Sequence, residues 1–230
     1  MEAPKITFKA CDSTNYRKGV NKQNKFIVIH YTANNGDTAW GNANYFANNK
    51  SLKASAHYFV DESEFWQSVK DGDIAYHCGA TNYKHLECRN GNSIGIEICS
   101  RKNANGVYYF KPEAVVNAIT LTQWLMSKYN IPVDNVIRHY DVTGKNCPAP
   151  FVQDASQWAL FKTKLTERVI DVALETWQKQ GGQNALKFLA EKGLVNNIEN
   201  WNSEEELAKA VPAYLFWMLM ARLAEYKGGK

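Results

Sequence analysis

The chain has 230 residues, of which 45% are hydrophobic and 22% are charged, a balance typical of a folded protein with one medium-sized domain and room for a small second one. This composition excludes disorder as the main state of the chain. The formal charge of +4 comes from Lys and Arg residues that are scattered rather than grouped, which argues against nucleic acid as a partner.

The start of the chain and its cysteines indicate a cellular compartment. The first residues, MEAPKITFKACDSTNYRKG, contain no uninterrupted apolar stretch of the kind that a secretory signal needs, so we expect synthesis in the cytoplasm without a signal peptide. No segment has the length of a transmembrane span. The five cysteines are odd in number and form no close tandem pairs, which favours reduced thiols over a disulfide framework.

The first third of the chain predicts a strand, a helix and a hairpin. The apolar run FIVIHY at 26–31 predicts a buried strand, and the following WGNANYFANN predicts a helix with Asp37 or Thr38 as its N-cap. The runs SAHYFVD and EFWQSV follow each other with only a short polar junction, which predicts a hairpin. The Gly- and Asn-rich region 71–92 is expected on the surface, where a long loop can line a binding site.

The middle of the chain continues the alternation of strands and helices. SIGIEIC at 93–99 predicts a strand that carries a carboxylate, Glu97, among apolar residues. Pro112 is suited to begin the next helix, which Asn130 and Pro132 should stop, and 133–138 predicts a further strand. The fold class predicted from this order is α/β, with a mixed central β-sheet flanked by helices, because the hairpin requires at least one antiparallel pair.

The last part of the chain predicts helices only. From Gln157 onward, apolar residues recur every three to five positions, and the GGQN at Gly181 is expected to break that pattern. ALKFLAEKG then predicts a short helix closed by Gly193. We therefore expect a catalytic domain at 1–165, a helical connector at 166–182 and a small all-helical module at 183–230.

Two histidines and a cysteine are candidates for a metal site. His30 ends the buried strand, while His139 and Cys147 flank a short polar loop in VIRHYDVTGKNCP. Two imidazoles and a thiolate can hold zinc and leave a fourth position open, an arrangement that usually serves hydrolysis. Taken singly, His30 would be read as a buried histidine with a backbone partner, and Cys147 as a small buried hydrophobe. The placement of two ligands at the ends of one loop favours the metal.

Four separated motifs, FIVIHYTAN, SAHYFV, NSIGIEIC and RHYDVTGKNCP, resemble the zinc-dependent N-acetylmuramoyl-L-alanine amidases of the phage-lysozyme and peptidoglycan-recognition superfamily. The resemblance covers about residues 26–148 and is strongest to phage or prophage endolysins from Gram-positive hosts. It implies that His30, His139 and Cys147 bind one zinc ion. It also implies that Glu97 acts near the attacking water and that Lys145 stabilises the oxyanion.

Physical chemistry singles out Glu97 independently. A carboxylate in an apolar strand has its pKa raised by desolvation, whereas a nearby zinc ion opposes that rise, so Glu97 could accept a proton from water near neutral pH. The alternative is a glutamate paired with Arg or Lys. Lys145 lies two residues before Cys147 and matches a lysine of the family motif, but without the resemblance it would be read as an ordinary surface residue.

The resemblance also suggests residues around the centre. His77, in AYHCG, matches a histidine of the family's substrate groove, and Tyr58, in SAHYFV, is a second candidate for substrate binding. Another branch of the superfamily carries a catalytic tyrosine where this chain has Ala56. This departure favours Glu97 as the catalytic residue. Arg138 and Asp141, on either side of the ligand His139, are expected to orient its imidazole by hydrogen bonding.

The function that the resemblance implies is hydrolysis of the amide between N-acetylmuramic acid and the L-alanine of the peptidoglycan stem peptide. The expected partner is bacterial peptidoglycan, reached after release at lysis of a Gram-positive host. The module at 183–230 is expected to bind the cell wall or to form a homodimer through its helices. One alternative is a recognition protein that binds muropeptides without cutting them. A structural zinc site is disfavoured, because only three ligands are evident.

Overall fold

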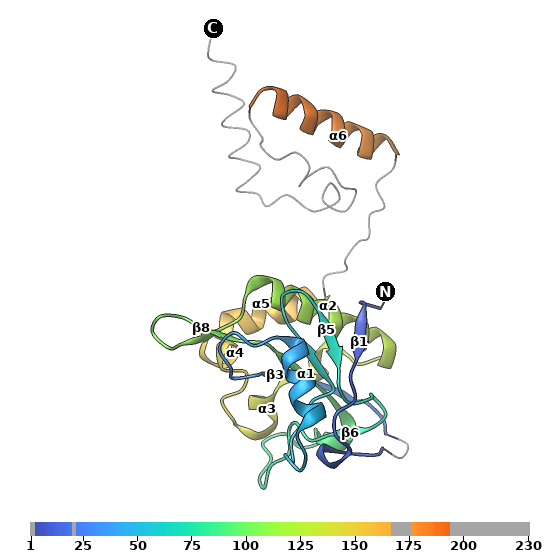
Figure 1. The fold of residues 1–230 in the computed structure, drawn as a ribbon, viewed down its shortest axis with the longest axis vertical. Helices are drawn as coiled ribbons and strands as arrows, with labels where there is room; N and C mark the ends of the chain where they lie inside the picture. Colours follow the sequence, from blue (N-terminus) through green and yellow to red (C-terminus); the bar gives the residue numbers. More distant parts are fainter. Residues whose placement is uncertain (1–2, 20–21, 167–175, 194–230) are drawn as a thin grey trace. The chain divides into compact units, whose positions relative to one another are not determined.

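The computed structural model describes residues 3–19, 22–166 and 176–193. The chain divides into two compact units, Met1–Arg168 and Val169–Lys230. The first unit is built on a six-stranded sheet (Figure 1). Its strands, in spatial order, are β1 (Ile6–Phe8), β5 (Phe65–Gln67), β4 (Tyr58–Val60), β7 (Ser93–Ile98), β3 (Phe26–Tyr31) and β10 (Val136–Arg138). All neighbours are parallel except the β4–β5 hairpin, so the predicted mixed sheet is confirmed.

The central strands β3 and β7 read as apolar runs because both faces of the sheet are covered. Ile27 and Ile29 of β3, together with Ile94 and Ile96 of β7, belong to the main hydrophobic core on one face. Residues at the alternating positions point to the opposite face, since side chains of a strand alternate with a period of two. On that face Phe26 and Val28 pack in a second apolar cluster, and the strand ends carry polar side chains.

Helices cover the two faces of the sheet unequally. On the main-core face pack α2 (Pro112–Tyr129) and α5 (Ala155–Thr166), with α4 (Ala149–Gln153) beside α5. The opposite face receives α1 (Ala39–Asn48), which contacts β4 and β5. Thr38 caps α1 by accepting a hydrogen bond from the Gly41 backbone, and Asn130 ends α2 in the left-handed conformation, as the sequence predicted.

Some segments differ from expectation. The strand predicted at 133–138 is a 3-10 turn, η3 (Val133–Asn135), followed by the shorter β10. The region 71–92 is not confined to the surface. Within it, β6 (Ile74–Ala75) pairs with β2 (Tyr16–Arg17), and Cys78 and Cys88 are fully buried. The remaining short elements are η1 (Ser13–Asn15), η2 (Asn90–Asn92) and the pair β8 (Arg101–Lys102) and β9 (Tyr108–Tyr109).

In the second unit, the described helix α6 (Thr176–Glu191) runs through Gly181, so the break predicted at GGQN is wrong. A glycine inside a helix costs only about 1 kcal/mol relative to alanine, which a long helix can tolerate. The helix ends at Glu191, and Gly193, the residue expected to close it, follows two positions later with a φ of +67°. The rest of the predicted module lies outside the described residues. None of the described helices has both the length and the apolar character that crossing a membrane requires.

Candidate metal centre and active site

The centre of the site is the edge of the sheet where β3 and β7 end. These strands are parallel, and their register pairs His30 directly with Glu97. Both side chains belong to the alternating set that faces away from the main core, because Ile29, Ile96 and Ile98 occupy the positions of the other set. In open α/β sheets, functional groups collect at the carboxyl ends of the strands.

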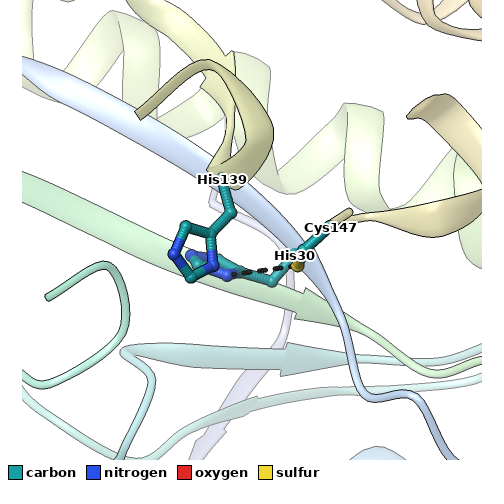
Figure 2. A group of neighbouring side chains, drawn as sticks. All are labelled: His30, His139 and Cys147. Carbon is teal, nitrogen blue, oxygen red and sulfur yellow. Dashed lines mark hydrogen bonds between the residues drawn. The ribbon is translucent and has the colours of Figure 1, made fainter. Parts of the chain in front are cut away.

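The other two candidate ligands come from the chain beyond β10. His139 is the first residue of α3 (His139–Thr143), and Cys147 follows the loop after that helix. The three side chains are buried, and one ligand atom from each lies within 4.8 Å of the others (Figure 2). The Nδ1 atom of His30 is 3.7 Å from the Cys147 sulfur, and the His30 and His139 rings are 4.7 Å apart.

The chemistry of these donors fits zinc. Burial lowers the pKa of His30 well below its ordinary value and that of His139 to about 4, so both imidazoles are neutral and have a free lone pair. The Nδ1 atom of His139 is buried without a hydrogen-bond partner. Burial raises the pKa of the Cys147 thiol to about 12, and a bound cation would release that proton. Two nitrogens and one sulfur leave a fourth position open.

The carboxylate of Glu97 lies at the edge of this cluster. One of its oxygens is 3.9 Å from His30 Nδ1, and the other is buried without a partner. Burial raises the pKa of Glu97 to about 8, the positive charge of Lys145 opposes this rise, and Asp37 adds to it. Among the described residues no Arg or Lys forms an ion pair with Glu97, so the alternative of a structurally paired glutamate receives no support.

Lys145 is exposed on the loop between α3 and Cys147. It lines one cavity together with the three candidate ligands and Glu97. A second cavity continues on one side through His77, His139 and Lys145, and a third continues on the other side from Glu97 toward Asp37 and α1. The cavity at the candidate metal centre therefore shares lining residues with two neighbouring cavities.

The two residues suggested for substrate binding lie in different places. His77 lines the central cavity, although only 8% of it is exposed. Tyr58 is 1% exposed in the main core, and its hydroxyl donates a hydrogen bond to Asp71. The period of two explains this placement, because Tyr58 pairs with Ile96 and so faces away from Glu97. Tyr58 therefore does not line the site, contrary to expectation.

Arg138 and Asp141 also differ from expectation. Their side chains bind each other, with Arg138 Nη2 and Nε at 2.8 and 3.0 Å from the two Asp141 oxygens. The Arg138 backbone N–H also donates to Asp141, which fixes the start of α3. Neither side chain bonds the His139 ring, so the pair positions the helix that carries the ligand rather than the imidazole itself.

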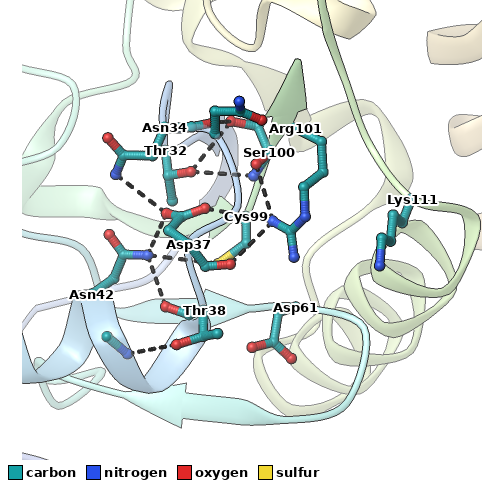
Figure 3. A network of polar contacts seen from close by, with 12 residues as sticks. Thr32, Asn34, Asp37, Thr38, Asn42, Asp61, Cys99, Ser100, Arg101 and Lys111 are labelled. Carbon is teal, nitrogen blue, oxygen red and sulfur yellow. Dashed lines mark hydrogen bonds and ion pairs between the residues drawn. The ribbon is translucent and has the colours of Figure 1, made fainter. Parts of the chain in front are cut away.

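Sequence reasoning missed a polar network around Asp37 (Figure 3), which lines a cavity together with Glu97. Asp37 accepts hydrogen bonds from the side-chain amides of Asn42 at 2.6 Å and Asn34 at 3.2 Å, and lies 3.8 Å from Arg101. The Asp37 charge helps to raise the pKa of Glu97. The NNGDT stretch after β3 contains Asn34 and Asp37, but its turn-like composition indicated only a candidate helix N-cap at Asp37.

This is an α/β protein with a candidate hydrolytic metal centre. Its mixed sheet carries His30 and Glu97 at the ends of the central strands, and His139 and Cys147 join them from the chain beyond β10. The chain belongs to the N-acetylmuramoyl-L-alanine amidase family, whose model matches residues 20–150.

Similar proteins agree with this assignment. N-acetylmuramoyl-L-alanine amidase CwlL of Bacillus licheniformis is 36% identical over 149 residues, which are 61% of this chain and 40% of CwlL. The catalytic domain of XlyA is 30% identical, with a TM-score of 0.59, over 70% of this chain and 99% of that structure. A mutant endolysin from Bacillus subtilis is 32% identical, with a TM-score of 0.58, over 71% of this chain and 99% of that structure. The chain thus spans about 40% of the length of CwlL.

Proposed function

We propose that this chain is a zinc-dependent amidase that hydrolyses the bond between N-acetylmuramic acid and the L-alanine of the peptidoglycan stem peptide. The observation that carries the proposal is the convergence of His30, His139 and Cys147 beside Glu97, one of whose buried oxygens has no hydrogen-bond partner among the described residues. Family membership and the endolysin among the similar structures support the substrate class. We further propose that the chain acts as an endolysin on a Gram-positive wall.

The metal would be held by His30, His139 and Cys147. Zinc in such a site supplies Lewis-acid chemistry, which makes water a better nucleophile near neutral pH and polarises a carbonyl group. The charge of a bound metal would oppose the burial that raises the pKa of Glu97, so that its carboxylate takes the proton of the attacking water and delivers it to the leaving amine of L-alanine. Lys145, whose ammonium group is free to reach the cavity, binds the carbonyl oxygen as negative charge develops on it.

The competing function is a recognition protein that binds muropeptides without cutting them. Such a protein needs a groove but no general base and no oxyanion donor. The presence of Cys147 as third donor, with Glu97 and Lys145 lining the same cavity, favours catalysis. A purely structural zinc site would require a fourth protein ligand, and the described residues place only three donors in this cluster.

The proposal is tested by digesting purified peptidoglycan fragments with the zinc-loaded chain and identifying the new ends by mass spectrometry. We expect free L-alanine amino termini and intact muramic acid carboxylates. A cut in the glycan or between stem peptides would contradict the assigned bond. Tight binding of fragments without any cleavage would instead support the recognition protein.

A further inference from the structure

The candidate ligand His30 contacts a second imidazole, that of His77, through the ring nitrogen that does not face Cys147. This nitrogen, His30 Nε2, lies 3.0 Å from Nδ1 of His77. The other nitrogen of His77, Nε2, is 3.1 Å from the hydroxyl of Ser93. That hydroxyl is in turn 2.7 Å from the backbone carbonyl of Arg89. A continuous chain of hydrogen bonds therefore runs from a backbone oxygen to the candidate metal ligand.

The donor and acceptor of each hydrogen bond in this series follow from its last member, the Arg89 carbonyl. A carbonyl oxygen can only accept, so Ser93 donates its hydrogen to Arg89 and must accept from His77 Nε2. A neutral imidazole has one N–H, so His77 Nδ1 is bare and accepts from His30 Nε2. His30 then keeps a bare Nδ1, the atom that faces the Cys147 sulfur.

The position of the His77 ring is built into the surrounding backbone. A Cβ atom on Gly95 would lie 2.6 Å from Cγ of His77, so only glycine lets the ring lie against β7. The side-chain oxygen of Asn90 accepts hydrogen bonds from the backbone N–H groups of His77 and Cys78, at 3.2 and 2.8 Å. The position of the His77 ring is thus fixed by its packing against Gly95 of β7 and by the hydrogen bonds from the His77 and Cys78 backbone to Asn90.

We propose that His77 is a positioning residue, which fixes the tautomer and orientation of His30 so that the bare Nδ1 faces the metal. This inference deepens the proposed zinc site and rests on it. His77 performs this role through Ser93 and not by binding substrate. Partners that orient metal-bound histidines in this way typically change metal affinity by about 10- to 100-fold when they are removed.

The first experiment needs no substitution. The chain has five histidines, so two-bond 15N–1H correlation spectra of the 15N-labelled full chain can assign the tautomer of each ring. In the zinc-free protein we expect His30 and His77 both to be protonated at Nε2 and bare at Nδ1. A His30 ring that is protonated at Nδ1 overturns the proposal.

The second experiment measures zinc affinity by competition with a chromogenic chelator in the full-length variants H77N, H77Q and H77L. Asparagine places an oxygen acceptor close to the position of Nδ1, whereas glutamine reaches toward Ser93 and leucine offers no acceptor. We expect H77L and H77Q to lose about 10- to 100-fold in zinc affinity, and H77N to retain most of it. Equal affinities for H77N and H77L, or no loss in H77Q and H77L, would refute the role of the acceptor.

The matched control is H57N. His57 is also fully buried, its ring centre is 5.5 Å from that of His77, and its Nδ1 accepts from the Gly95 backbone, but it bonds no candidate ligand. We expect its zinc affinity to stay within twofold of the native chain, and a loss as large as that of H77L would show a packing effect instead. If the native chain binds no zinc, the proposed function fails. If the native chain and the His77 variants bind zinc with equal affinity, only this inference is refuted.

Discussion

Glu97 is unusual because it is a carboxyl group held at the end of an apolar strand, where no Lys or Arg of the described part of the chain forms an ion pair with it. Burial raises its pKa to about 8, and one of its oxygens has no hydrogen-bond donor. Retaining an unpaired carboxylate in such a place costs stability, which a structural role would not explain. Its position opposite His30 in the β3–β7 register gives it access to whatever the metal centre binds.

We predict that E97Q strongly lowers turnover while leaving zinc bound. Glutamine has nearly the same shape but cannot accept a proton, so the rate should fall by about 100-fold or more. Turnover is followed by the release of L-alanine amino termini from muropeptides, and zinc content by elemental analysis of the same sample. Near-normal turnover would remove Glu97 from the mechanism, and loss of zinc would make it a ligand.

We predict that K145M lowers kcat by about 100- to 1,000-fold, equivalent to about 3 kcal/mol of transition-state stabilisation, with a much smaller change in KM. The physical reason is that its ammonium group matters most when negative charge develops on the carbonyl oxygen. The control is K84M, which removes an exposed lysine whose ammonium lies 4.3 Å from the Tyr140 ring, outside the central cavity. A K145M enzyme with normal kcat and raised KM would assign Lys145 to substrate binding alone.

The packing of α2 against the sheet includes a buried polar junction at Asp71. One of its oxygens accepts from Tyr58 at 2.6 Å and Gln67 at 2.9 Å, and the other from Lys128 at 2.9 Å and Tyr129 at 2.6 Å. The junction joins β4 and β5 to the last turn of α2. It also explains why Tyr58 is a structural residue.

We predict that D71N destabilises the protein by about 3 kcal/mol, because an amide offers one acceptor oxygen where four donors converge and leaves Lys128 without its counter-charge. The free energy of unfolding is measured in urea. The matched control is D154N at the start of α5, where the partly exposed Asp154 accepts from the Ser156 and Gln157 backbones with one oxygen, which asparagine retains, and from the Gln157 side chain with the other. Equal stabilities of D71N and D154N would contradict the assigned role.

The elements that sequence could predict are those defined by local pattern. The runs of β3 and β7 and the capping residues of α1 and α2 carry their own signals, and the strand-end position of His30 follows from them. The face of the sheet to which Tyr58 points depends on the register of a three-residue strand, and a short apolar run does not specify that register. The contact between His77 and His30 could not be predicted either, because it depends on an irregular segment folding back onto Gly95.

The three candidate ligands come from segments far apart in the chain, so metal binding stabilises the arrangement of β3, α3 and the loop after it. We predict that zinc removal lowers the midpoint of thermal unfolding, and that zinc at about a thousandfold excess over its dissociation constant contributes about 4 kcal/mol. Thermal unfolding is recorded across a series of buffered zinc concentrations. The control C147A should show a much weaker dependence, and a native midpoint that does not respond to zinc would contradict the site.

The candidate site lies in the first compact unit. Every candidate catalytic and metal residue lies within Met1–Arg168, and the family model ends at residue 150. Residues 183–230, for which a small helical module is expected, lie in the second unit. We propose that they form a cell-wall targeting module, since attachment to a polymer raises the local concentration of its bonds around the enzyme.

Truncation after Arg168 tests this division of labour. We predict that the shortened chain cleaves soluble muropeptides within twofold of the native rate, because its site is intact, but loses at least about 100-fold in affinity for sedimented cell walls, since a second attachment multiplies affinity by about that factor or more. Rates are compared on both substrates, and mass is measured by light scattering. Unchanged wall binding with a halved mass would instead show that the helices form a dimer. Loss of turnover on soluble fragments would show that the site depends on the second unit.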